Sequence, residues 1–170
     1  MDAPVAVEPY SDEWPRRFAE ERGVLEEALR PWLAGPIEHI GSTAVPGLAA
    51  KPVIDIMAAV ESLEASRPAL ARLAPLGYLY APYRAEIMHW LCKPSPEVRT
   101  HHLHLVPIGS QLWKDRIAFR DRLRSEPALA EAYASLKRDL ARMYVNDREA
   151  YTDGKQPFIE MVLRGRPSPT

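Results

Sequence analysis

The feature that most constrains this fold is the run of residues 53–60, VIDIMAAV, which is apolar at every position except Asp55. A short run that is apolar on both faces is typical of a central strand covered on both sides. Burying a carboxylate in such a strand is costly unless it has a partner. Asp55 therefore needs an explanation, either a functional role or a structural pairing with Lys51 or an arginine.

The surrounding patterns predict an α+β domain in which helices pack on a mixed sheet of about five strands. The other strands are expected at 37–40 and at about 78–82, 86–92 and 101–107. Helices are expected at 12–34, 66–77, 110–124 and 125–144. A last helix is expected from Asn146-Asp147, broken at Asp153-Gly154 and Pro157 and restarted with Phe158, Met161, Val162 and Leu163 facing inward.

Composition excludes several classes of protein. With 46% hydrophobic residues the chain can fold, and its formal net charge of -1 argues against general nucleic-acid binding, so any phosphate chemistry must be local. No stretch approaches the roughly 18 apolar residues of a membrane span, and the acidic start is unlike a signal peptide. We expect a cytoplasmic protein, a single domain over 1–170, and a buried, unreactive Cys92 as its one cysteine.

A second motif lies just before the apolar run. Gly41-Ser42 follows the short strand 37–40, and Asp55 comes thirteen positions after Ser42. Glycine permits close backbone approach, the Ser42 hydroxyl and nearby N–H groups can bind phosphate oxygens, and a carboxylate on the next strand can hold a divalent cation. Ser42 and Thr43 could instead cap a turn.

The longer block 38–56, EHIGSTAVPGLAAKPVIDI, resembles the GrpB family, which is usually placed in the nucleotidyltransferase superfamily of the polymerase β type. The resemblance extends over most of the chain. It includes Tyr10, Trp14-Pro15, Leu76-Gly77-Tyr78, His102-Leu103-His104, Phe119-Arg120-Asp121, Tyr133, Leu136-Lys137, Tyr151-Thr152, Lys155 and Phe158-Ile159. It implies a nucleotidyltransferase-like sheet with a C-terminal helical segment. It also implies phosphate-binding roles for Lys51 and Lys155, which belong to the family motif.

The chain departs from the superfamily pattern at Met57, where a second acid is expected two residues after Asp55. One carboxylate cannot hold two metal ions. His102 and His104 are candidate replacements, because strand alternation places both on one face, and His39 could reach the same edge. The alternative is that these histidines are structural. One aspartate with two or three histidines suits Mn²⁺, Fe²⁺, Ni²⁺ or Zn²⁺ better than Mg²⁺.

The leading hypothesis is a metal-dependent nucleotidyltransferase with Asp55 as its catalytic residue, acting on a nucleoside triphosphate and a small-molecule acceptor. One alternative is a non-catalytic nucleotide- or metal-binding module on a degenerate scaffold, with a protein partner. Some family members are fused to dephospho-coenzyme A kinase, which implies such an accessory role. The other alternative is a metal-dependent hydrolase with the same Asp/His site.

Overall fold

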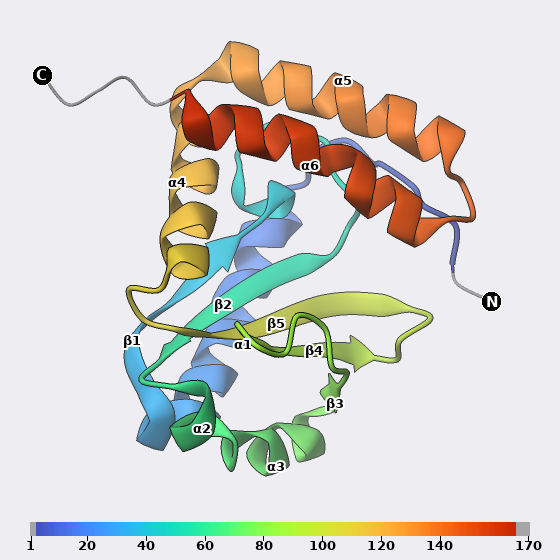
Figure 1. The fold of residues 1–170 in the computed structure, drawn as a ribbon. Coiled ribbons are helices and arrows are strands. Elements are labelled where there is room, and N and C mark those ends of the chain that lie inside the picture. Colours follow the sequence, from blue (N-terminus) through green and yellow to red (C-terminus); the bar gives the residue numbers. More distant parts are fainter. Residues whose placement is uncertain (1–2, 166–170) are drawn as a thin grey trace, which may run out of the picture.

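A five-stranded mixed sheet forms the centre of the computed structural model, which describes residues 3–165 (Figure 1). Its order is β1 (Leu33–Ile40), β2 (Ile54–Val60), β5 (Arg99–Pro107), β4 (His89–Pro94) and β3 (Leu79–Tyr80). The β2–β5 pair is parallel, and the other neighbours are antiparallel. The expected mixed sheet with packed helices is confirmed, and β2, which carries Asp55, is an inner strand.

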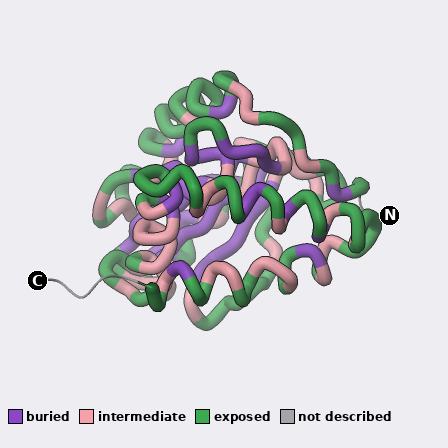
Figure 2. Tube along the Cα trace, turned by 90° about the horizontal axis from the view of Figure 1, so that it is seen from above, coloured by how far each residue is buried: buried purple, intermediate pink, exposed green. Residues whose placement is uncertain are grey.

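Helices cover both faces of this sheet, as the buried sheet and exposed helical surfaces of Figure 2 show. One face packs against α1 (Glu13–Leu29) and α3 (Ala69–Leu73) through a cluster that includes Leu25, Leu73 and Ile56. The other face packs against α4 (Gln111–Ser125) through Met57 and Val106. Both faces of β2 are therefore covered, as its apolar run predicted.

The C-terminal part forms a second layer, in which α5 (Pro127–Met143) and α6 (Arg148–Arg164) lie side by side above the sheet (Figure 1). Helix α5 begins at Pro127, whose missing N–H costs nothing in a first turn, and the Asp147 side chain caps α6 by accepting from Ala150 N at 2.9 Å. Aromatic residues from α5 and α6 then pack around the loop after β1. This layer faces the end of β2 that carries Asp55.

The first helix and first strand differ from the sequence prediction. Helix α1 ends at Leu29, a 3-10 turn follows over Arg30–Trp32, and β1 already begins at Leu33. The strand passes through Gly35-Pro36 with a register shift against β2, whereas the Gly-Pro pair predicted a break. Proline is tolerated here because β1 is an edge strand at which a backbone N–H is dispensable.

The expected helix at 66–77 is divided into α2 (Leu63–Ser66), α3 and a 3-10 turn, Ala74–Leu76. Pro68 and Pro75 interrupt it, because proline supplies no N–H to a continuing helix. Gly77 ends the segment with a φ of 89°, so the predicted left-handed cap is confirmed.

Helix α6 is continuous, so the predicted break at Gly154 and Pro157 is wrong. A Cβ on Gly154 would lie 2.6 Å from a methyl carbon of Leu140, so this glycine lets α5 and α6 approach closely. Val162 faces inward as predicted, but Met161 is 54% exposed. Among the described residues, no helix has the length and apolarity that crossing a membrane requires.

Candidate active site

Asp55, His102 and His104 meet on one face of the sheet. In the parallel β2–β5 register, Asp55 stands opposite His102 and Met57 opposite His104. Asp55 Oδ1 lies 2.9 Å from His102 Nδ1 and 3.4 Å from His104 Nε2. Leu103 and Leu105 point to the opposite face, where they are fully buried. The alternation predicted for 102–105 is confirmed.

The electrostatics of this cluster favour an ionised carboxylate beside neutral imidazole. Burial acts to raise the pKa of Asp55, but the charge and hydrogen bonds of His102 and His104 outweigh it and hold that pKa well below its usual range. Burial lowers the pKa of His104 to about 4, against the opposing effect of its hydrogen bond to Asp55. Near neutral pH, His104 is therefore in the uncharged form that binds metal ions.

The three facing ligand atoms fit a single divalent cation. They all lie within 4.8 Å of one another, and the separations of 2.9 and 3.4 Å are those of neighbouring ligands about 2.0–2.2 Å from one ion. The remaining ring nitrogens, His102 Nε2 and His104 Nδ1, are buried without a hydrogen-bond partner in the described part of the chain. Two histidines with one carboxylate favour iron, zinc or another transition metal over magnesium.

Gly41 lies directly against the carboxylate. Its φ is 72°, and a Cβ added there would come within 2.7 Å of Asp55 Oδ2. The sequence predicted that this glycine allows close approach, and the structure identifies the Asp55 side chain as the group that approaches. Tyr133 of α5 lies near the next residue, Ser42, and near Asp55. The turn thus links the end of β1 to both Asp55 and the helical layer.

His39 does not join the cluster. It pairs with Ile56 on β2, and neighbouring residues of a strand alternate in direction, so its ring lies on the opposite sheet face from Asp55. There it stacks on Phe18 and contacts Thr43 Oγ1 through Nε2 at 2.9 Å. Thr43 Oγ1 is buried and donates to Val53 O, which fits the turn-capping alternative, and a phosphate contact of Thr43 stays a prediction.

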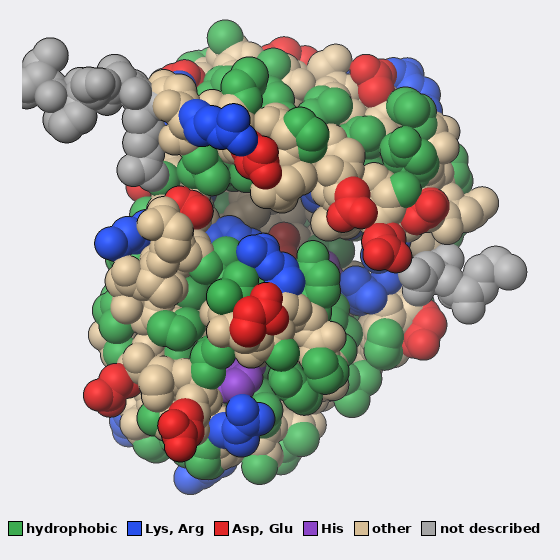
Figure 3. Space-filling view, in the orientation of Figure 1, with side chains coloured by type: hydrophobic (Ala, Val, Ile, Leu, Met, Phe, Trp, Pro, Cys, Tyr) green, Lys and Arg blue, Asp and Glu red, His purple; other side chains and the backbone are tan. Residues whose placement is uncertain are grey.

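Positive charge surrounds the carboxylate. The ammonium groups of Lys51 and Lys155 lie 4.9 and 4.8 Å from the centre of the Tyr151 ring. Burial lowers the pKa of both lysines, that of Lys155 to about 8, while Asp55 acts to raise them. Arg116 of α4 also interacts electrostatically with Asp55. Burial lowers the pKa of Arg116, and the Asp55 carboxylate opposes that shift. Figure 3 shows a hollow between α5–α6 and the sheet with Lys and Arg side chains at its edge.

Sequence reasoning missed Arg116, Tyr133 and Tyr151 as parts of this site. Their helical spacing is typical of any amphipathic helix, and nothing in the pattern shows which residue faces the sheet end. A surface depression of about 520 Å³ lies along the end of α6, but none of its lining residues belongs to the Asp55 cluster.

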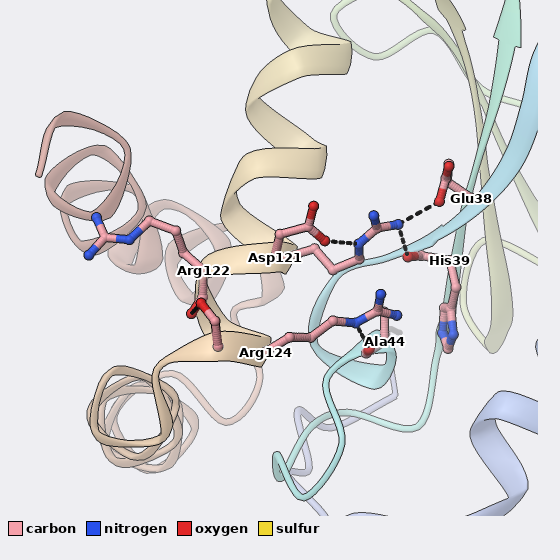
Figure 4. A network of polar contacts seen from close by, with 8 residues as sticks. Glu38, His39, Ala44, Asp121, Arg122 and Arg124 are labelled. Atoms are coloured by element: carbon pink, nitrogen blue, oxygen red, sulfur yellow. Dashed lines mark hydrogen bonds and ion pairs between the residues drawn. The ribbon is translucent and has the colours of Figure 1, made fainter. Parts of the chain in front are cut away.

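Helix α4 holds the strand end and the turn in place (Figure 4). Arg120 donates to Glu38 Oε2 at 2.6 Å and to the carbonyl oxygen of His39 at 3.1 Å. Arg124 Nε donates to Ala44 O at 2.8 Å. These arginines tie α4 to both sides of the Gly41-Ser42 turn, so they act on the site by positioning it.

The chain belongs to the GrpB family: the family model described as "GrpB protein" matches residues 4–164. It is 40% identical to the UPF0157 protein PA4798 of Pseudomonas aeruginosa over 95% of this chain and 67% of that one. It is 34% identical to the glutamate-rich protein GrpB of Alkalihalophilus pseudofirmus over 94% of each chain. The crystal structure of the conserved protein GrpB from Enterococcus faecalis matches with a TM-score of 0.85 and 34% identity, over 94% of this chain and 95% of that one.

More distant structures show the nucleotidyltransferase-like fold. The structure of the GLD-2/RNP-8 complex matches with a TM-score of 0.60 at 13% identity, over 95% of this chain and 62% of that one. The Cid1 poly(U) polymerase with Mg 3′-dATP bound matches with a TM-score of 0.56 at 13% identity, over 87% of this chain and 49% of that one. At such low identity the likeness concerns the fold alone.

One relative combines this kind of domain with more sequence. A dephospho-CoA kinase of Mycolicibacterium paratuberculosis is 28% identical to 95% of this chain, and the match covers 46% of that protein. A domain of this type therefore forms about half of a larger protein there.

Proposed function

We propose that this protein is a metal-dependent nucleotidyltransferase acting on a nucleoside triphosphate and a small acceptor. The observation that carries the proposal is the Asp55–His102–His104 cluster at the sheet end, adjoining the Gly41-Ser42 turn and faced by Lys51 and Lys155. A buried carboxylate among cations, on a fold shared with a polymerase, is an arrangement suited to binding a polyphosphate.

In this proposal Asp55, His102 and His104 hold one divalent cation, of which Mn²⁺, Fe²⁺, Ni²⁺ or Zn²⁺ suits the ligands best. When bound, it would supply neutralisation of charge on the phosphate oxygens. Ser42 donates a hydrogen bond to the β- or γ-phosphate, and Lys51 and Lys155 orient the triphosphate by charge. The acceptor hydroxyl or amine bonds to the α-phosphorus, the bond to the β-phosphate oxygen breaks, pyrophosphate leaves, and the acceptor proton passes to water.

The first test is thermal unfolding with Mg²⁺, Mn²⁺, Ni²⁺ or Zn²⁺, each with and without the four nucleoside triphosphates. A ligand at about 100 times its Kd adds about 2.7 kcal/mol, which is about 5–10 °C for a domain of this size. We expect a nucleotide shift that requires metal and disappears in Asp55→Asn. The matched control is Asp139→Asn, which alters an exposed carboxylate on α5. A shift retained in Asp55→Asn would refute the assignment of this site.

Turnover is tested by the release of pyrophosphate in the presence of a panel of small acceptors. Formation of inorganic phosphate or nucleoside monophosphate with water as the acceptor would instead support the metal-dependent hydrolase. Both assays use Asp55→Asn as the inactive reference.

A second candidate is a non-catalytic accessory module, favoured by the relationship to half of a dephospho-CoA kinase and by Met57 in place of a second acid. A module of this kind would bind nucleotide without metal, or would bind no nucleotide and associate with a partner protein. Nucleotide shifts that are equal with and without metal, together with no turnover, would favour it over the enzyme.

A further inference from the structure

One wall of the Asp55 site has no role in the proposed triphosphate contacts. It consists of α4 and the loop 81–88, which joins β3 to β4 and passes in front of the sheet below α6 in Figure 1. Ile87 of this loop and Trp113 of α4 pack against the same apolar cluster, which includes Met57. Because Met57 lies on the Asp55 face of β2, the loop and α4 both cover that face.

Tyr83 connects this loop to the Asp55 cluster through a row of rings. Its ring centre lies 6.2 Å from that of Trp90 with the two planes at 70°, and the Trp90 ring centre lies 5.1 Å from that of His102. Trp90 is 8% exposed, whereas Tyr83 is 50% exposed. Tyr83 therefore presents an accessible aromatic ring at the outer end of a row that begins at the candidate metal ligand His102.

The loop holds Tyr83 in place before any ligand arrives. Ala81 N donates to Trp90 O at 3.1 Å, which ties the start of the loop to β4. Arg84 adopts a φ of 47°, the only positive φ of a residue other than glycine in the described chain, and its carbonyl oxygen accepts from Ile87 N at 3.0 Å. Such a conformation persists only where the surrounding structure fixes it. A ring ordered in this way loses little entropy on binding.

Arg116 lies on the face of α4 that is turned to the sheet. It comes three positions after Trp113, which packs on the sheet, and four before Arg120, which donates to a backbone carbonyl oxygen of β1 at 3.1 Å. Burial lowers the pKa of Arg116, and Asp55 and Tyr83 oppose that shift, as expected of groups near the guanidinium. Arg116 thus stands between the carboxylate and the exposed ring.

The guanidinium of Arg116 is without a direct partner. It is partly buried, and within residues 3–165 it makes no hydrogen bond and no ion-pair contact. A desolvated guanidinium whose N–H donors have no acceptor is unfavourable, and an anion that accepts from them removes that penalty. Arg116 is therefore suited to a phosphate oxygen of a ligand bound at Asp55.

The residues assigned to the β- and γ-phosphates lie next to α6. The ammonium groups of Lys51 and Lys155 both stand over the Tyr151 ring of that helix. A nucleoside triphosphate is a chain whose nucleoside lies at the end remote from the γ-phosphate. When its phosphates are held at Asp55 and the two lysines, the nucleoside extends away from α6, toward the loop 81–88.

We infer that α4 and the loop 81–88 bind the nucleoside end of the triphosphate, with the base stacked on Tyr83 and the α-phosphate held by Arg116. The inference rests on the proposed function, because it takes Asp55 as the place of the phosphates. Every base has a π face, so the four nucleoside triphosphates should bind alike. Arg116 then contacts the phosphate at which the transfer occurs, where a fixed cation stabilises developing charge.

Titration calorimetry with Mn²⁺ tests the stacking by comparing ATP with inorganic triphosphate, which has no nucleoside. Tyr83→Leu should weaken ATP binding about tenfold and leave inorganic triphosphate unchanged, because only the base stacks on the ring. Tyr83→Phe should bind ATP as the wild type does, since it keeps the ring. The matched control is Tyr80→Leu, which alters a tyrosine 39% exposed whose ring contacts His89 on the opposite sheet face.

Arg116→Gln tests the phosphate contact. It should weaken the binding of ATP and of inorganic triphosphate about tenfold each, because it removes a charge-assisted contact that both ligands can make. Lys114→Gln, which removes an exposed charge from the same helix, should change neither. Thermal unfolding without ligand shows that the compared variants are folded.

The outcomes separate this inference from the proposed function. If Asp55→Asn abolishes metal-dependent ATP binding but Tyr83→Leu changes ATP and inorganic triphosphate equally, or changes neither, the inference is overturned and the proposed function stands. If ATP binds equally without Mn²⁺ and Tyr83→Leu still weakens ATP alone, this wall binds the nucleoside and the metal-dependent enzyme is refuted. A wild type that binds no ATP refutes both.

Discussion

Gly41 and Asp55 depend on each other at the scale of single side chains. The glycine adopts a φ of 72°, and the space that a Cβ would need is taken by Asp55 Oδ2. Two requirements therefore coincide at one residue, a left-handed backbone conformation and room for a carboxylate. Only the room for the carboxylate concerns the candidate site. Gly47 has a similar positive φ without a neighbouring carboxylate, so it allows the two requirements to be tested separately.

We predict that Gly41→Ala disrupts the site, whereas Gly47→Ala does not. Gly47 has a similar φ of 80° but nothing within 4 Å of its added Cβ. Both variants should lose about 1–2 kcal/mol of stability from the left-handed backbone. Only Gly41→Ala should also displace the carboxylate and lose the metal-dependent nucleotide shift. Urea unfolding and thermal shift measure the two effects, and equal nucleotide shifts in the two variants would contradict the prediction.

Helix α4 is the element that connects the turn to the rest of the molecule. Arg120 and Arg124 contact backbone carbonyl oxygens on either side of Gly41-Ser42 (Figure 4). These hydrogen bonds position the turn, together with the packing of Val45 and Leu48 in the apolar cluster around Tyr133. A small shift of α4 is therefore expected to move the proposed phosphate-binding residues.

We predict that Arg124→Met weakens nucleotide binding several-fold while lowering stability by only about 1 kcal/mol, the usual worth of one hydrogen bond. Methionine keeps most of the side-chain volume and removes the donor to Ala44 O. Arg138→Met, which removes a 3.5 Å exposed ion pair on α5, is the control. Nucleotide titration calorimetry gives the comparison, and the same affinity in both variants would show that α4 does not position the turn.

At the scale of the whole molecule, buried neutral histidines make the fold sensitive to acid. Burial lowers the pKa of His39 to about 4 from an unfolded value of 6.5. Between those values the unfolded chain binds more protons, so the free energy of unfolding falls as the pH drops from about 6.5 to 4. Asp55 has a lowered pKa, so its ionised carboxylate keeps stabilising the folded protein until the pH falls below 3.8.

We predict that His39→Gln removes part of this acid sensitivity. Glutamine can still contact Thr43 but does not titrate. From pH 6.5 to 4, the variant should therefore lose about 3 kcal/mol less of its free energy of unfolding than the wild type. Urea unfolding at pH 7 and pH 4.5 measures it. Identical pH dependence in the two proteins would mean that His39 is not the group that takes up a proton on unfolding.

A run that is apolar on both faces was enough to predict that Asp55 is in an inner strand, and period-two alternation was enough to predict that His102 and His104 share a face. The same rule could not place His39, because the register of β1 against β2 depends on a shift near Gly35 that no local pattern reveals. Gly154 was misleading because its close packing against Leu140 outweighs its low helix propensity. Arg116 and Tyr151 required the placement of whole helices, which the sequence leaves open.

The parallel pairing of β2 with β5 has a consequence for how the protein matures. Asp55 and His102 are 47 positions apart, and β3, β4 and two short helices lie between them in the chain. Closing a loop of that length is a slow, non-local event in folding. Before this pairing forms, the carboxylate of Asp55 and the two histidines lie on separate parts of the chain. Ligand binding that requires Asp55 is therefore a marker of completely folded chains. It distinguishes them from collapsed intermediates that already contain helices.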